Sequence, residues 1–164
     1  MEGPGKLKPD AGKSLVVFMR PTNFLSTGTA AVYDDLEYAG SLPGDTRFSY
    51  QTEPGEHMFM VIGENADFMK AVLAPDKTYY ARVITRYGIS NFRYGFVPFN
   101  GEPETGLQEW LKTTQPMVVN ENGKEWAVEN AETIKELHDG YLPVWLNKRE
   151  DLRAKQTLLE SSGR

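Results

Sequence analysis

The sequence contains no cysteine and only two histidines among its 164 residues. Without cysteine the chain can form no disulfide, no thiolate nucleophile, no zinc site with cysteine ligands and no cysteine-ligated iron–sulfur cluster. It has no apolar run near the ~18 residues that a transmembrane helix requires. It has no block of basic residues, and its formal net charge is −5. This charge argues against binding to nucleic acid or to an anionic membrane surface.

Familiar catalytic and nucleotide-binding motifs are also missing: the sequence has no Gly-x-Ser-x-Gly, no P-loop and no glycine-rich dinucleotide loop. Its residues are 40% hydrophobic and 12% aromatic, which is enough to bury a core. We divide the chain into a flexible leader at 1–13, a β-sandwich domain at 14–100 and a helical C-terminal extension at 101–164. The leader, MEGPGKLKPDAGK, is polar and rich in glycine and proline, which is typical of a tether and not of a signal peptide.

Short β-rich runs alternate with turn signals between residues 14 and 99. The connections are too short for crossover helices, so the sequence predicts a mainly β fold. We expect an antiparallel β-sandwich of about seven or eight strands, immunoglobulin- or prealbumin-like, with a C-terminal α-helical appendage. The expected strands are 14–20, 29–35, 36–42, 46–52, 57–63, 66–74, 77–88 and 91–99. The residues expected to be buried between two sheets are Val17, Phe48, Tyr50, Phe59, Val61 and Val83.

Beyond Glu102 the hydrophobic period becomes helical, with expected helices at 104–114, 125–138 and 148–160. Asn147 and Glu150 have capping-box spacing for the last of these. Gly140 and Pro143 predict a break that reverses the chain into a helical hairpin or corner. Its apolar side is expected to cover an open face of the sandwich or to pair with a second subunit. Leu152 and Leu159 are the residues that we would place in a dimer seam.

His57 is one candidate for chemistry, as a general base or a metal ligand. A hydrolase would pair it with Glu53 or Asp45, but no other part of such a site is visible in the sequence. The favoured interpretation is a strand-opening residue that is hydrogen-bonded near a turn. An acidic cluster at a hairpin tip, with members Asp34, Asp35 and Glu37, is read in the same way: turn formation is favoured over Ca²⁺ binding or acid–base work. We expect no metal site, no cofactor and no catalytic residue.

The segment TRYGISNFRYGFVPF (85–99) is dense in aromatic residues and contains two arginines. If one face is exposed, it forms a stacking platform for a sugar or a protein partner. The candidate binding residues are Tyr87, Phe92, Arg93, Tyr94 and Phe99. The alternative is that these rings belong to the core, because Phe92, Tyr94 and Phe96 share one strand face, and this alternative is favoured.

Four segments follow one another in a distinctive order. They are VVFMRP (16–21), VYDDLEYAGSL (32–42), FSYQTEPGEH (48–57), which leads into Pro-Gly-x-His, and KTYYARV (77–83), with its Lys-Thr-Tyr-Tyr-x-Arg strand. Together they resemble a bacterial family of unknown function whose members are small β-sandwich domains of envelope lipoproteins. The resemblance covers about half of the chain and implies no catalytic role for His57. The chain departs from the family at Asp76, where glycine is usual, and it lacks the lipobox cysteine.

These observations favour a non-catalytic, lipoprotein-like domain of the bacterial envelope that binds a protein partner or envelope component, or scaffolds an assembly. The alternative is a carbohydrate- or peptidoglycan-binding module that uses the aromatic residues of 85–99, and a hydrolase centred on His57 is the third hypothesis. The expected location is the periplasm or cell envelope, with membrane anchoring through a removed N-terminal segment, and the alternative is the cytoplasm. The tail also allows a homodimer through its helices.

Overall fold

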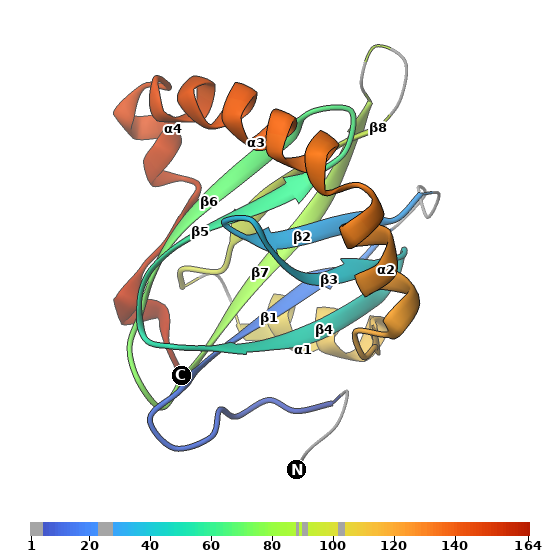
Figure 1. Ribbon diagram of the computed structural model, residues 1–164. Helices are drawn as coiled ribbons and strands as arrows, with labels where there is room; N and C mark the ends of the chain where they lie inside the picture. Colours follow the sequence, from blue (N-terminus) through green and yellow to red (C-terminus); the bar gives the residue numbers. More distant parts are fainter. Residues whose placement is uncertain (1–4, 23–27, 88, 90–91, 102–103) are drawn as a thin grey trace.

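The computed structural model describes residues 5–22, 28–87, 89, 92–101 and 104–164. Over these residues, ten strands form two five-stranded sheets (Figure 1). The first sheet contains, in spatial order, β8 (Phe92–Pro98), β7 (Lys77–Tyr87), β1 (Ser14–Arg20), β4 (Thr46–Thr52) and β9 (Gln115–Pro116). The second contains β10 (Thr157–Leu158), β6 (Ala66–Leu73), β5 (Gly55–Ile62), β2 (Ala30–Asp34) and β3 (Glu37–Leu42). The helices are α1 (Glu104–Thr113), α2 (Glu121–Glu129), α3 (Ala131–Leu146), α4 (Glu150–Ala154) and the 3-10 turn η1 (Glu160–Ser162).

The mainly β fold with C-terminal helices is as expected, but the antiparallel arrangement is not. β1 pairs in parallel with β7, with Ser14 opposite Lys77, and its other edge pairs antiparallel with β4. The prediction assumed that parallel neighbours need a crossover helix. Here the segment between β1 and β7 instead forms strands of the second sheet, namely β2, β3, β5 and β6. Two short strands, β9 and β10, also pair in parallel, so both sheets are mixed.

The strand order also differs from that of an immunoglobulin constant domain. In that fold the first strand pairs with the second. In this chain β1 pairs with β4 and β7, and β2 lies in the other sheet. The immunoglobulin part of the expectation is therefore not supported.

β1 is buried on both faces. Val16 and Phe18 lie between the two sheets. Val17, which we expected there, faces the other way because successive strand residues point to opposite faces. It packs with Tyr80 and Leu107 beneath α1. The prediction for Val17 was wrong because an apolar run on both faces does not reveal which face meets the second sheet.

Aromatic rings fill the space between the sheets. Phe18 contacts Phe48, Phe59 and Phe96, with ring centroids 5.4, 5.1 and 5.9 Å apart. The other predicted core residues are confirmed: Phe48, Phe59, Val61 and Val83 are buried, and Tyr50 packs against them while partly buried. The alternation of the strands was sufficient to locate them.

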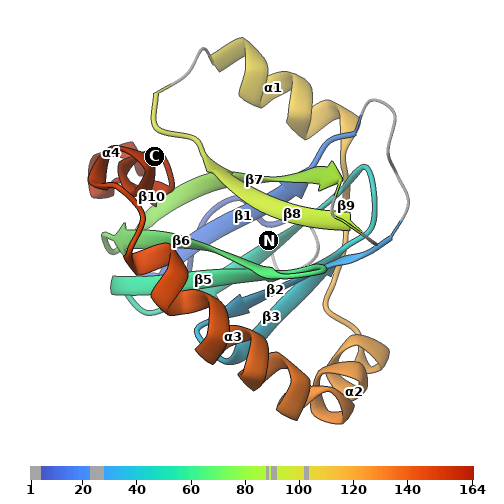
Figure 2. The ribbon, with the colours of Figure 1, turned by 90° about the horizontal axis from the view of Figure 1, so that it is seen from above.

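Helices cover both outer faces of the sandwich (Figure 2). α1 packs on the first sheet through Leu107. α3 packs on the second sheet, where its buried Ile134 and Trp145 contact a cluster that includes Met60 and Phe68. The C-terminal extension thus supplies a helical layer on each outer face, and the two sheets lie between these layers.

α3 runs through both residues that were expected to end it. Gly140 and Pro143 lie inside the helix, and the change of direction falls at Asn130, between α2 and α3. A proline inside a helix removes one hydrogen bond and costs about 3 kcal/mol. The buried residues on either side of it offset this cost, because Ile134 and Trp145 can both reach the sheet only if the helix is continuous.

The last segment closes the side of the sandwich. β10 adds to β6, and its Leu158 is completely buried in the main core. Further on, Arg164 and Thr78 exchange backbone hydrogen bonds of 2.9 Å in both directions, which joins the segment to β7. The predicted helix over 148–160 is therefore wrong: only Glu150–Ala154 is helical, and Arg149 occupies its N-cap.

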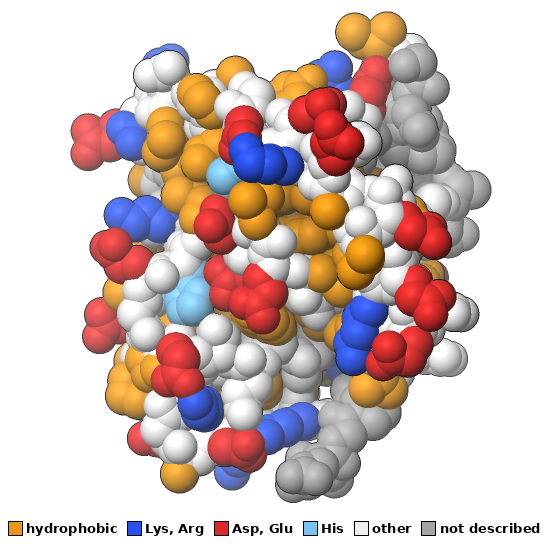
Figure 3. All heavy atoms as spheres, in the orientation of Figure 1, with side chains coloured by type: hydrophobic (Ala, Val, Ile, Leu, Met, Phe, Trp, Pro, Cys, Tyr) orange, Lys and Arg blue, Asp and Glu red, His pale blue; other side chains and the backbone are white. Residues whose placement is uncertain are grey.

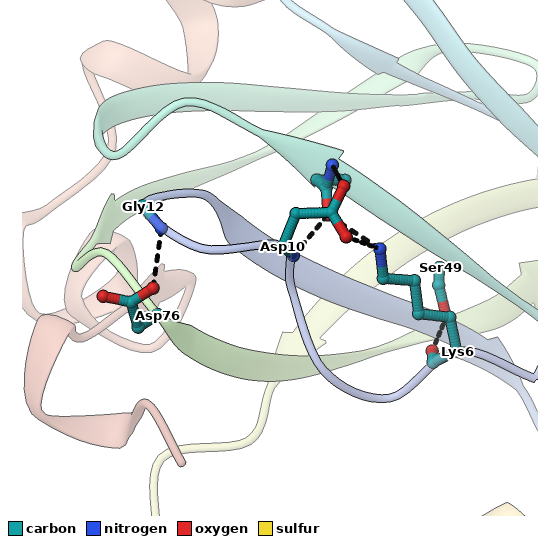
Figure 4. Close-up of polar contacts among 6 residues, drawn as sticks. Lys6, Asp10, Gly12, Ser49 and Asp76 are labelled. Atoms are coloured by element: carbon teal, nitrogen blue, oxygen red, sulfur yellow. Dashed lines mark hydrogen bonds and ion pairs between the residues drawn. The ribbon is translucent and has the colours of Figure 1, made fainter. Parts of the chain in front are cut away.

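The described part of the leader lies across the outer face of the first sheet, where Leu7 packs in the cluster beneath α1. Figure 4 shows its polar contacts with β4 and with Asp76. Ser49 Oγ donates to the Lys6 carbonyl at 2.5 Å, and the Lys6 ammonium pairs with Asp10 at 2.6 Å. The Gly12 amide donates to Asp76 Oδ1 at 2.7 Å. Asp76 has a φ of 62°, so aspartate adopts here the left-handed conformation that glycine otherwise supplies.

Candidate functional site

Both histidines bind carboxylates of the hairpin that joins β2 to β3. The His57 ring donates from Nδ1 to Asp34 Oδ2 at 2.8 Å and from Nε2 to the Glu53 carbonyl at 2.7 Å. Tyr50 donates its hydroxyl to the same Asp34 oxygen at 3.0 Å. The partner of His57 is therefore Asp34, and neither the Glu53 carboxylate nor Asp45 takes that role. The Asp45 carboxylate instead accepts from the Thr22 amide.

This geometry favours the protonated form of His57. Both ring nitrogens face acceptors, so both carry hydrogen. The hydrogen bond to Asp34 raises the pKa of His57, and the bond to the Glu53 carbonyl adds to this effect while burial opposes it. An imidazolium whose two N–H groups are already engaged has no lone pair with which to accept a proton. The arrangement fastens the head of β5 to the hairpin.

His138 makes the corresponding contact from α3. Its Nε2 lies 2.8 Å from Asp35 Oδ1 and its Nδ1 lies 3.0 Å from Asp139 Oδ1. Asp35 has a φ of 53°, which is consistent with its position at the tight turn. Figure 3 shows both imidazoles (pale blue) on one face, with acidic side chains (red) beside them. The described residues contain no group of three or more histidine, aspartate or glutamate side chains that could hold a metal ion.

A cleft of about 280 Å³ lies between the β7–β8 hairpin and α3. Its lining residues are Asn65, Ala66, Asp67, Arg86, Arg93, Tyr94, Tyr141, Val144, Trp145 and Lys148. One wall therefore comes from the aromatic segment of the sandwich and the other from the tail. We call this cavity the arginine cleft.

Three cations line the arginine cleft, and two of them are neutralised. Arg93 Nε lies 3.1 Å from Glu64 Oε2, and Lys148 Nζ lies 3.7 Å from Asp67 Oδ1. Arg86 is exposed and has no ion-pair partner among the described residues. Its cationic charge is therefore available to a ligand.

A hydrogen-bond chain holds the inner wall in place. Trp145 Nε1 donates to Gln156 Oε1 at 2.8 Å, and Gln156 Nε2 donates to Asp67 Oδ2 at 2.6 Å. The same Asp67 oxygen accepts from the Phe96 amide at 3.2 Å. The chain connects the tail to both sheets, so the cleft is preformed.

The structure separates the residues that the aromatic segment suggested. Arg93 and Tyr94 line the arginine cleft, although Tyr94 is only 7% exposed and the Arg20 guanidinium lies over its ring, 4.9 Å from the centroid. Phe99 is 4% exposed and packs beneath α1 against Trp110, with the ring centroids 6.1 Å apart. The side chains of Tyr87 and Phe92 lie outside the described residues.

The sequence interpretation missed the wall that the tail provides. Tyr141, Trp145 and Lys148 are spaced by four and three residues, which places them on one side of a helix and its extension. The signal was present, but the break expected at Pro143 separated Tyr141 from the other two. Arg86 was noticed only as an interleaved arginine.

Among the described helices, none is long and apolar enough to cross a membrane. A scan against models of known protein families and a search of curated proteins found no match for this chain.

Proposed function

We propose that the protein is a non-catalytic binding domain that takes an anionic ligand in the arginine cleft. The observation that supports this most directly is the charge of Arg86, which has no ion-pair partner within the described part of the chain and lies beside Arg93 and Lys148. Arginine offers a planar set of donors that matches a carboxylate or phosphate. The engaged ring nitrogens of His57 support the absence of catalysis.

The ligand class that fits best is an acidic saccharide, such as a carboxylated sugar of peptidoglycan. Tyr141 and Val144 supply apolar surface for the C–H faces of a ring, and Asn65 supplies an amide for hydroxyl groups. The cleft volume of about 280 Å³ suits a single ring and not a long chain. This proposal keeps the carbohydrate alternative but moves it from the exposed aromatics of 85–99 to a cleft shared with α3.

The test compares two sugars that differ by one lactyl ether group, which carries the only carboxylate of the pair. N-acetylmuramate and N-acetylglucosamine are titrated into the isotopically labelled protein, and amide chemical shifts are followed by NMR. We expect residues around the cleft to shift with N-acetylmuramate only. Arg86→Gln should weaken binding by about ten- to a hundredfold, since a hydrogen bond to a charged group contributes about 1.5–3 kcal/mol.

Arg149→Gln is the matched control. Arg149 is exposed next to Lys148, pairs with Asp151 and does not line the cleft. The Arg149→Gln substitution removes the same charge from the same region, but outside the cleft, so it should leave the affinity for N-acetylmuramate within about twofold of the wild type. Equal binding of the two sugars, or equal losses in the two variants, would refute the proposal.

The proposed location is the periplasm or cell envelope, with lipoprotein-like anchoring through a removed N-terminal segment and the cytoplasm as the alternative. The resemblance to envelope lipoproteins supports it. Fractionation of cells that express the native gene tests it, since a signal-free cytosolic pool would contradict it. We also propose the prealbumin-like form of the sandwich, which the two-sheet arrangement of β1 to β8 supports.

A homodimer through the C-terminal region is a further proposal. Leu152 and Leu159 are 42% and 48% exposed, so apolar side chains are available for contact. They do not share a helix, because Leu152 lies in α4 and Leu159 lies just before η1. Analytical ultracentrifugation of the native chain and of Leu152→Glu distinguishes a dimer from a monomer.

A further inference from the structure

A second cavity lies between the β2–β3 hairpin and the corner of α2 and α3. Its volume is about 570 Å³, within the range of about 300–1,000 Å³ that small-molecule sites occupy. The lining residues are Tyr33, Leu36, Tyr38, Lys124, Ala127, Val128, Ala131, Ile134 and Lys135. Figure 3 shows hydrophobic side chains (orange) gathered at the centre of this face. We call this cavity the hairpin groove, and it is distinct from the arginine cleft.

The groove exists because the two helices touch the sheet at separate points. α2 approaches β3 at Gly123, where a Cβ atom would lie 2.5 Å from the Tyr38 hydroxyl, so a larger residue would displace the Tyr38 side chain. α3 meets the sheet through Ile134 and Trp145. Between these contacts the chain turns at Asn130, and small side chains at Ala127 and Ala131 leave the space open.

The rim of the groove is apolar and exposed. Leu36 lies at the tip of the hairpin and Val128 lies on the last turn of α2, and both are among the exposed large hydrophobic residues. Exposed apolar side chains that surround a concave site are typical of ligand binding.

The polar groups of the groove are all capable of donating. Tyr33 is 2% exposed, and its hydroxyl has no hydrogen-bond partner among the described residues. The hydroxyl is itself enclosed, so a ligand in the groove does not reach it. Lys124 and Lys135 contribute one cationic side chain from each helix, and among the residues that the structure describes no carboxylate side chain lines the groove.

The two lysines are not locked in their present contacts. Lys124 lies 3.1 Å from Glu121 and Lys135 lies 2.5 Å from Asp139, but both pairs are exposed and lie within one helix. Such pairs contribute little, so a ligand can replace either carboxylate at small cost.

We infer that the hairpin groove binds a small amphipathic carboxylate, with an apolar acyl body along Leu36, Val128 and Ile134 and its carboxylate near the two lysines. The apolar lining favours an apolar acyl chain in the ligand, and the two lysines favour a negatively charged head group. The complement of these two cations is an anion, whose oxygens accept hydrogen bonds from both ammonium groups.

The probe is decanoate below its micelle concentration, followed by amide NMR shifts and by the thermal midpoint. We expect saturable shifts in residues around the groove and a rise in the midpoint that grows with ligand concentration. Decyltrimethylammonium has the same chain with the opposite charge and should bind at least tenfold more weakly. Equal binding of the two probes would overturn the carboxylate assignment.

Three variants separate the groove from non-specific binding. Ala131→Phe fills the groove from an exposed helix position and should weaken decanoate binding at least tenfold, whereas Ala154→Phe makes the same change on α4 and should have no effect. Lys124→Gln should weaken binding several-fold through loss of one cation. Equal affinity in Ala131→Phe and the wild type would refute the inference. If instead decanoate does not bind and Ala131→Phe turns a dimer into a monomer, the groove receives a second copy of the chain and the inference is wrong.

Discussion

Leu158 and Leu159 offer a test of the way the tail closes the sandwich. They are adjacent and chemically identical, but Leu158 is 0% exposed and Leu159 is 48% exposed. Leu158 packs in the main core with Tyr79 and Ala71, whereas Leu159 faces solvent. Alanine at Leu158 should therefore leave a cavity between the sheets, and alanine at Leu159 should not.

The expected losses follow from burial. Truncating a buried leucine to alanine lowers the free energy of unfolding by about 2.7–5.0 kcal/mol. We expect about 3 kcal/mol for Leu158→Ala, because the two-residue strand that carries it can partly readjust. For a chain of this size that corresponds to a fall of about 6–12 °C in the thermal midpoint. Leu159→Ala should lose less than about 1 kcal/mol, since half of its surface stays in water.

Urea unfolding of both variants, followed by tryptophan fluorescence, measures the difference. The dependence of free energy on urea should be the same in both variants, so the shift in midpoint reports stability alone. Equal losses in the two variants, or a loss below about 1 kcal/mol for Leu158→Ala, would show that the last segment does not seal the core.

Three further predictions concern other parts of the chain. The raised pKa of His57 means that the stabilisation it gives the fold is complete below pH 6.5 and is lost as pH rises through the folded pKa. The difference in unfolding free energy between wild type and His57→Gln should therefore narrow from pH 5.5 to 8.5, and a difference that widens would contradict this. Gly40→Ala would place a Cβ 2.8 Å from the Phe48 ring and should lower the free energy of unfolding in urea by about 1–3 kcal/mol. Gly140→Ala adds a Cβ in open space and should stabilise α3 by about 0.5–1 kcal/mol. Equal effects of the two substitutions would refute this. Truncation after Asp139 removes Trp145 and Leu158 from the clusters and should lower the thermal midpoint and solubility, and an unchanged midpoint would contradict it.

Local features of the fold could be read from the sequence. All eight strands expected between residues 14 and 99 are present, because alternation and turn residues are encoded within a few positions. Turns lie between these strands where the turn residues occur, and in the turn that contains Pro43 and Gly44 the left-handed residue is Asp45, with a φ of 58°. Asparagine and aspartate adopt this conformation at low cost, so the sequence did not decide between neighbours.

Non-local features could not be read in this way. The parallel pairing of β1 with β7 depends on how two sheets share one core, and no short pattern encodes it. The path of α3 through Pro143 depends on the sheet that receives Trp145. For the same reason only one wall of the arginine cleft could be predicted from the sequence. Arg93 and Tyr94 lie in the aromatic segment 85–99, but the wall that faces them comes from a helix far along the chain.

The central position of β1 has a consequence for the kinetics of folding. Its two neighbours pair residue 14 with residue 52 and with residue 77, so its sheet requires the closure of long loops. The hairpins β2–β3 and β5–β6 need only short loops and can form earlier. During that interval the run SLVVFMR stays unpaired, and a short apolar segment of high β-propensity tends to associate with copies of itself. Refolding yield should therefore fall with protein concentration even under conditions in which the native state is fully stable.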